Sequence, residues 1–167
     1  MTLRRVDETS KSFRILVVDD YEPWRDFIVN TLKKESGLEV IGQVSDGSAA
    51  VQQAHQLKPD LILLDIGLPK LNGIQAAARI RESSPSSKIL FISENRYADI
   101  VERALSTGAG GYVIKSDAAG ELVPAIKAVL EGKRFISASL TGHFLVAGSL
   151  VTTQNLSWLV VLISGNC

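Results

Sequence analysis

Cysteine, excess charge and long apolar runs are all scarce in this sequence. Its one cysteine, Cys167, is the last of 167 residues, which excludes an internal disulfide framework and a cysteine-based metal cluster. Lys plus Arg equals Asp plus Glu, at 18 each, so no net field favours nucleic acid or an anionic membrane surface. Residues 1–12 mix charges without an apolar core, which predicts a polar leader rather than a secretion signal. A cytoplasmic location fits these absences.

Charge is also missing from the C-terminal end. Residues 135–167 contain no Lys, Arg, Asp or Glu, so we predict an uncharged apolar tail of unknown role over residues 134–167. The stretch 143–163 is long enough to cross a bilayer, but the polar run 152–155 interrupts it and argues against a membrane span. We expect the tail to pack on the chain itself or on a second copy; a remnant without a role is the alternative.

The stretch between leader and tail, residues 13–133, has the length of one domain with its own core. Apolar runs predict strands at residues 13–18, 38–44, 61–64, 88–92 and 111–114. Helical spacing predicts helices at about 23–37, 48–57, 74–82, 97–106 and 118–131. Strand and helix alternate five times, which predicts the α/β class: a doubly wound five-stranded parallel sheet with helices on both faces.

Four of the predicted strands end in polar side chains. Asp19 and Asp20 follow the first strand, Asp65 the third, Ser93 the fourth and Lys115 the fifth. In an open parallel sheet, ligands bind beyond the carboxyl ends of the strands. Each residue has an ordinary alternative role, as a helix cap, a turn residue or a solvated lysine. Their occurrence at successive strand ends instead predicts one shared site.

This set of residue types favours phosphoryl chemistry. Three carboxylates in one crevice repel one another unless a cation shares the site. Oxygen ligands suit Mg²⁺, whereas zinc would have only His55 and His143, both outside the cluster. With Mg²⁺ present, Asp65 can attack a phosphoryl group while Lys115 and Ser93 stabilise its oxygens. The sequence therefore predicts aspartyl phosphorylation.

A set of short motifs extends over nearly all of residues 13–131. They are Val17-Val18-Asp19-Asp20, Leu63-Leu64-Asp65-Ile66-Gly67-Leu68-Pro69, Asn72-Gly73, Ser93 and Gly108-Ala109-Gly110-Gly111-Tyr112-Val113-Ile114-Lys115. As a set, they resemble the CheY-like receiver domains of bacterial two-component response regulators. The resemblance implies the flavodoxin-like strand order 2-1-3-4-5. It also implies that Asp65 accepts a phosphoryl group from a sensor histidine kinase, with no catalysis beyond this phosphorylation and its reversal.

Roles for the other residues follow from the same resemblance. Asp20, Asp65 and the main-chain carbonyl of Gly67 would bind Mg²⁺, with Asp19 assisting through water. Gly67 has no side chain with which to position or block a water near the phosphoacceptor. The expected cofactor is therefore Mg²⁺.

Three further residues have expected roles near the phosphoryl group. By the resemblance, Ser93 and Lys115 would contact that group, and Tyr112 would be the aromatic switch that follows the Ser93 hydroxyl. Glu94 departs from the family pattern, in which a small residue is usual. It either hinders an incoming phosphoryl group or points to solvent.

The segments 109–116 and 129–137 look like the NarL/FixJ-type branch, which usually has a helix-turn-helix domain. An uncharged tail offers no phosphate contacts, so we predict no direct nucleic-acid binding by this chain. The expected function is a switch whose phosphorylation changes partner binding. Its homodimer would use the tail or the face of the fourth helix, fifth strand and fifth helix. The alternative is a constitutive protein-interaction module with a receiver fold that phosphorylation does not regulate.

Overall fold

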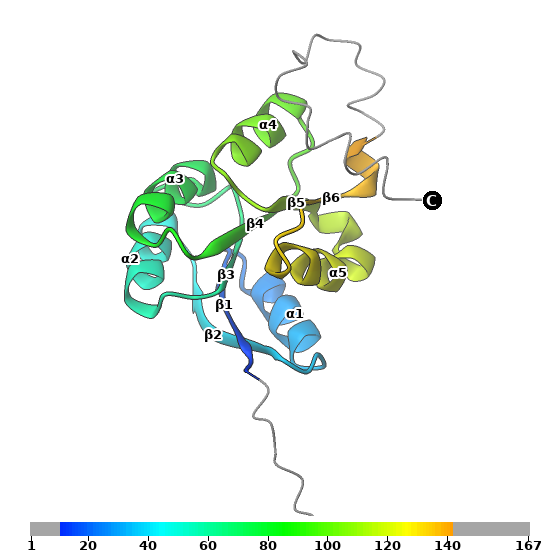
Figure 1. Cartoon of the computed structure of the whole chain (residues 1–167). Helices are drawn as coiled ribbons and strands as arrows, with labels where there is room; N and C mark the ends of the chain where they lie inside the picture. Colours follow the sequence, from blue (N-terminus) through cyan, green and yellow to red (C-terminus); the bar gives the residue numbers. More distant parts are fainter. Residues whose placement is uncertain (1–10, 142–167) are drawn as a thin grey trace, which may run out of the picture.

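A parallel sheet forms the centre of the computed structural model, which describes residues 11–141 (Figure 1). Its strands are β1 (Phe13–Val18), β2 (Leu38–Val44), β3 (Leu61–Leu64), β4 (Lys88–Ser93), β5 (Gly111–Ile114) and β6 (Phe135–Ile136). They lie in the order β2-β1-β3-β4-β5-β6, and every neighbouring pair is parallel. The predicted order 2-1-3-4-5 is therefore confirmed, and a sixth strand extends it.

Helices cover both faces of this sheet. The α-helices of the described residues are α1 (Glu22–Leu32), α2 (Gly47–Leu57), α3 (Gly73–Ser83), α4 (Ala98–Ser106) and α5 (Ala118–Leu130). Successive strand residues face opposite sides, so Leu16 belongs to the core under α2, α3 and α4, and Val17 to the core under α1 and α5. The predicted doubly wound α/β class is confirmed.

Capping residues fix where two of the helices begin. Asp46 accepts a hydrogen bond from the backbone N–H of Ala49 at 2.8 Å and caps α2, as is usual for an aspartate that directly precedes a helix. That hydrogen bond is the main reason why the pKa of Asp46 lies below its usual value. Asn72 caps α3 through a capping box with Gln75. The two caps hold the loops after β2 and β3 close to the carboxyl edge of the sheet.

The sixth strand was not expected from the sequence, which predicted a five-stranded sheet. β6 pairs with β5 through Phe135 N–H to the Gly110 carbonyl at 3.1 Å and Ser137 N–H to the Tyr112 carbonyl at 2.9 Å. Ser137 Oγ also accepts a hydrogen bond from the Ile114 N–H at 2.8 Å. A strand of two residues shows no readable alternation, and its position depends on these tertiary contacts. The rest of the predicted tail, residues 142–167, and most of the predicted leader lie outside the described residues.

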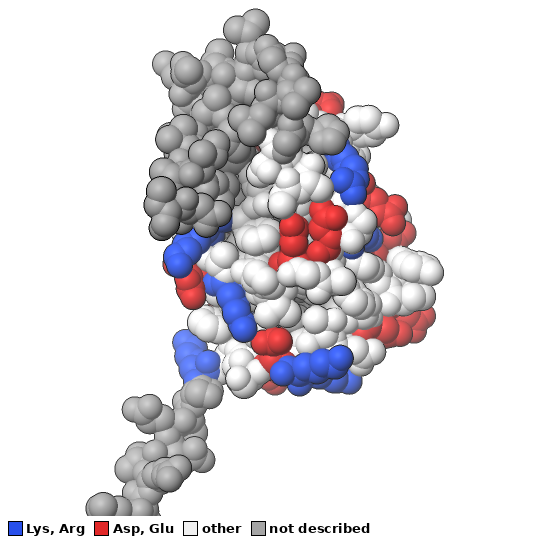
Figure 2. All heavy atoms as spheres, turned by 90° about the vertical axis from the view of Figure 1, so that its right-hand side faces the viewer, with Lys and Arg blue, Asp and Glu red and all other residues white. Residues whose placement is uncertain are grey.

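The charged side chains on one face of the molecule are dispersed. Figure 2 shows Lys and Arg side chains separated by acidic and uncharged ones on the face turned toward the viewer. This agrees with the equal totals of the two signs in the sequence. Within residues 11–141, no helix has the length and the apolar character needed to cross a membrane.

Candidate functional site

The polar residues predicted at the strand ends meet at one edge of the sheet. β1, β3, β4 and β5 are neighbours and parallel, so the residues that end or follow these strands converge. They border a cleft of about 800 Å³. Its lining includes Asp20, Asp65, Gly67, Ser93, Glu94 and Lys115. The sheet topology thus brings the predicted Mg²⁺ ligands and phosphoryl contacts to one place.

Three carboxylates crowd together at this cleft. Oxygens of Asp19, Asp20 and Asp65 all lie within 4.8 Å of one another. Asp19 and Asp65 are buried, with 1% and 7% of their surface exposed, whereas Asp20 is exposed. Buried carboxylates this close need compensating positive charge.

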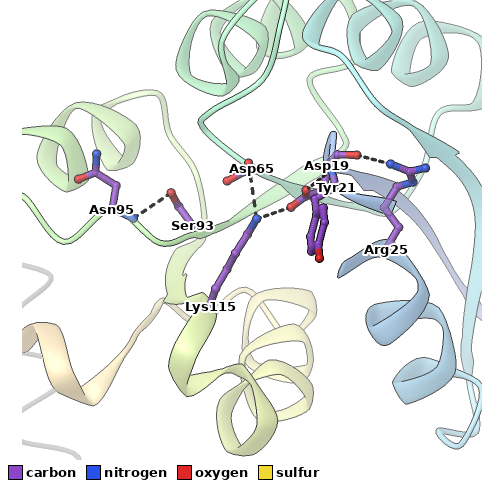
Figure 3. A network of polar contacts seen from close by, with 7 residues as sticks. All are labelled: Asp19, Tyr21, Arg25, Asp65, Ser93, Asn95 and Lys115. Carbon is purple, nitrogen blue, oxygen red and sulfur yellow. Dashed lines mark hydrogen bonds and ion pairs between the residues drawn. The ribbon is translucent and has the colours of Figure 1, made fainter. Parts of the chain in front are cut away.

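Lys115 supplies part of that charge. Its ammonium nitrogen lies 2.6 Å from Asp19 Oδ2 and 3.6 Å from Asp65 Oδ2, between the two carboxylates (Figure 3). Arg25 donates from Nη1 to the main-chain carbonyl of Asp19 at 2.7 Å rather than to a carboxylate. Among the described residues, the two buried carboxylates of Asp19 and Asp65 therefore share one ion-paired lysine.

The pKa of Asp65 reflects these surroundings. Burial raises it from an ordinary 3.8 to about 6, the ammonium of Lys115 opposes the rise, and the charge of Asp19 adds to it. Around neutral pH, Asp65 is therefore mostly ionised but held in an unfavourable environment. A cation that neutralises the charge would be favoured there.

Ser93 and Tyr112 lie on the β4 and β5 side of the cleft. Ser93 Oγ accepts a hydrogen bond from the backbone N–H of Asn95 at 3.2 Å. Tyr112 is fully buried, and its hydroxyl donates to the main-chain carbonyl of Asn95 at 2.8 Å. Burial raises the pKa of Tyr112 to about 12, so the phenol is neutral and a hydrogen-bond donor. Both residues thus contact the loop between β4 and α4.

The donor set suits a hard divalent cation. The carboxylate oxygens come from three residues, and one of them, Asp19 Oδ2, is buried without a hydrogen bond of regular geometry from the described residues. Gly67 lies in the same cleft, and a Cβ at this position would meet only the Asp65 carboxylate, at 3.8 Å. An all-oxygen set with open space beside it fits Mg²⁺, which keeps several of its waters.

Comparison with known proteins identifies the pattern of strand-end residues. The family described as the response regulator receiver domain matches residues 15–127. The chain belongs to this family. Receiver domains of this family are components of two-component systems, as the sequence motifs predicted.

Individual relatives agree with this assignment of the receiver. Response regulator GacA from Pseudomonas viridiflava is 35% identical over 127 residues, which are 76% of this chain and 59% of the relative. Transcriptional regulatory protein DegU from Brevibacillus brevis is 33% identical over 132 residues, 79% of this chain and 56% of the relative. The receiver thus spans less than two thirds of the length of these relatives.

A solved structure also agrees with the assignment to the receiver family. The crystal structure of a LuxR-family two-component response regulator from Aurantimonas sp. SI85-9A1 has a TM-score of 0.77 at 30% identity, covering 81% of this chain and 96% of that chain. This neighbour agrees with the NarL/FixJ-type branch that the sequence predicted.

Sequence reasoning missed one group of contacts in this receiver. Trp24 lies within the helix predicted at about residues 23–37 and was assigned no role at the site, yet the Lys115 ammonium lies over its ring, 5.3 Å from the centroid. Tyr21 N–H donates to Asp19 Oδ1 at 2.9 Å, and this contact was not foreseen either. The available signal was position, because a residue in the first turn after the acidic pair must lie beside the cleft.

Proposed function

We propose that this receiver accepts a phosphoryl group on Asp65 from a phosphohistidine of a sensor histidine kinase, in a reaction that requires Mg²⁺. One observation supports this proposal most strongly. The acidic set, which is Asp19, Asp20 and Asp65, converges with Ser93 and Lys115 at one cleft. No other cluster of three acidic, histidine or cysteine residues that could hold a metal occurs within residues 11–141.

The transfer is an in-line displacement. An oxygen of the Asp65 carboxylate forms a bond to phosphorus, the bond from phosphorus to the donor imidazole breaks, and the leaving imidazole takes up a proton. Lys115 and the hydroxyl of Ser93 stabilise the phosphoryl oxygens as charge spreads over them. Asp20, Asp65 and the Gly67 carbonyl would hold Mg²⁺, with Asp19 assisting through water. The bound ion supplies charge neutralisation between carboxylate and phosphoryl group.

The switch would work through the loop between β4 and α4. Ser93 and Tyr112 both contact Asn95 in this loop. A phosphoryl group that draws the Ser93 hydroxyl toward itself would remove the acceptor of the Asn95 N–H and change how Tyr112 is held. We propose that this alters the surface of α4, β5 and α5 and so changes which partner binds.

The same proposal includes the extent of the receiver, its location and its partners. Residues 13–133 act as the receiver in the cytoplasm, β6 from the predicted tail 134–167 completes its sheet, and the chain itself does not contact nucleic acid. A homodimer would use the face of α4, β5 and α5 or the C-terminal tail, and β6 lies beside this face because it pairs with β5. Glu94 lies at the cleft, where its charge would disfavour an incoming anionic donor.

Intact-protein mass spectrometry after incubation with acetyl phosphate and Mg²⁺ tests the proposal. We expect one phosphoryl adduct that disappears in Asp65→Asn and when EDTA removes the metal. Asp60→Asn is the matched control, because Asp60 lies at the other end of the same strand and should leave labelling intact. Absence of an adduct under conditions that label an ordinary receiver would support the constitutive interaction module instead, and Glu94 would then be the first residue to replace.

A further inference from the structure

The contact between Lys115 and Trp24 adds an aromatic ring to the surroundings of the lysine. The Lys115 side chain is only 13% exposed, and its ammonium lies 5.3 Å from the centroid of the Trp24 ring. A cation over the face of an indole is attracted by the negative face of the ring, most strongly where water is largely excluded. The ammonium is thus held from one side by carboxylates and from another by a ring.

Neighbouring contacts fix the position of the Trp24 ring. Trp24 is in the first turn of α1, where its backbone N–H donates to the Tyr21 carbonyl at 3.1 Å. Its ring packs on Phe27, with the centroids 4.9 Å apart. Tyr21 N–H in turn donates to Asp19 Oδ1, so the turn that places the ring is tied to the carboxylate that pairs with Lys115. The same turn therefore positions both the Trp24 ring and the Asp19 carboxylate.

We propose that Trp24 is a positioning residue for Lys115, an inference that rests on the phosphorylation proposed above. A divalent cation bound by the acidic set would compete with the ammonium for carboxylate oxygens, above all for Asp19 Oδ2. A lysine has four flexible carbon bonds and would then be free to leave the cleft. The Trp24 ring still attracts the ammonium and keeps it where an incoming phosphoryl group needs it.

The first test observes the contact directly, in the full chain and without any phosphodonor. The ε-methylene protons of Lys115 are followed by NMR in protein labelled with ¹³C-lysine, with the signal assigned by Lys115→Arg. We expect an upfield ring-current shift that persists when Mg²⁺ is added, is reduced in Trp24→Phe and is lost in Trp24→Leu. A wild-type shift that vanishes on addition of Mg²⁺ would overturn the proposal, because the ring would then release the lysine when it is needed.

The second test measures the rate of phosphorylation by acetyl phosphate. We expect Trp24→Leu to slow it about three- to tenfold and Trp24→Phe to slow it less, because phenylalanine retains a smaller π face. In a Lys115→Met background, Trp24→Leu should cause no further loss, because the ring acts through the lysine. Equal losses in both backgrounds, or a loss that follows the thermal unfolding midpoint, would show a structural role only. If wild-type protein takes up no phosphoryl group, the proposed function fails, and the NMR result still decides whether the contact exists.

Discussion

The two ends of β3 each have an aspartate, and the two residues differ in how their carboxylates are satisfied. Asp60, just before the strand, accepts a hydrogen bond from Arg14 N–H at 2.8 Å, and its own backbone groups bond to β1 and β4. Asp65, just after the strand, is buried beside other carboxylates and has Lys115 at 3.6 Å. The first carboxylate stabilises the fold, and the second is held at a cost in stability.

The two ends of β4 repeat this contrast with serines. Ser87, just before the strand, is fully buried and donates to the Pro59 carbonyl at 2.6 Å, and its oxygen lies 2.8 Å from Ser84 Oγ. Ser93, the last residue of the strand, has its hydroxyl at the cleft. The amino edge of the sheet is therefore well hydrogen-bonded, and the carboxyl edge places polar groups at the cleft where we propose that the chemistry occurs. The unfavourable buried charge of Asp65 is thus supported by well-bonded structure at the other edge of the sheet.

The largest loss of stability should come from a side chain placed in the narrow space beside the Asp65 backbone. Gly73 starts α3, and a Cβ there would lie 2.0 Å from the main-chain oxygen of Asp65. We expect Gly73→Ala to cost about 3 kcal/mol or more of unfolding free energy, because backbone rather than a flexible side chain must move. Urea unfolding monitored by circular dichroism measures it. Gly67→Ala is the control and should change stability by less than about 0.5 kcal/mol, since its Cβ would make only an ordinary contact with the Asp65 carboxylate at 3.8 Å. Similar losses in both variants would contradict the close packing at this strand end.

Much of this architecture could be predicted from the sequence, because the signals are local. The strand runs, the Asp46 cap and the polar residues at the strand ends all follow from short-range patterns. The contact of Trp24 with Lys115 could not, because it joins the first turn of α1 to the end of β5 across the sheet edge. β6 was missed for a similar reason: two residues become a strand only when β5 is beside them.

The second effect separates Asp60 from Asp65 by the sign of the stability change. In metal-free buffer at pH 7, Asp65→Asn should stabilise the protein by about 1–3 kcal/mol, because it removes a buried and crowded charge. Asp60→Asn should destabilise it by about 0.5–1 kcal/mol, because a charged acceptor becomes neutral. Urea midpoints with unchanged m-values would establish both effects. Destabilisation by both substitutions would abolish the proposed contrast between the strand ends.

The gain from Asp65→Asn should also depend on pH. The pKa of Asp65 is about 6 in the folded chain against an ordinary 3.8, so the folded state keeps a proton that the unfolded state has released. Wild-type stability should therefore fall as the pH rises from about 4 to about 6, by up to about 3 kcal/mol from this group, and level off above. Asp65→Asn should lack this component, so its advantage should grow over the same window and shrink when Mg²⁺ is added. If the gain in unfolding free energy from Asp65→Asn were constant from pH 4 to 7, it would come from packing and not from the ionisation of Asp65.

The last pair of effects should come from the two serines at the ends of β4, and the effects should fall on different measurements. Ser87→Ala should cost about 1–2 kcal/mol of stability, because the Pro59 carbonyl loses its buried donor, and should leave the rate of phosphorylation unchanged. Ser93→Ala should cost less than about 1 kcal/mol, since the hydrogen bond that Ser93 Oγ accepts from the Asn95 N–H is long, yet slow phosphorylation by about tenfold or more. Thermal unfolding and acetyl phosphate labelling of both variants would measure these effects. If Ser87→Ala slowed labelling as much as Ser93→Ala, the chemistry would depend on the stability of the whole sheet, and the division between its two edges would be wrong.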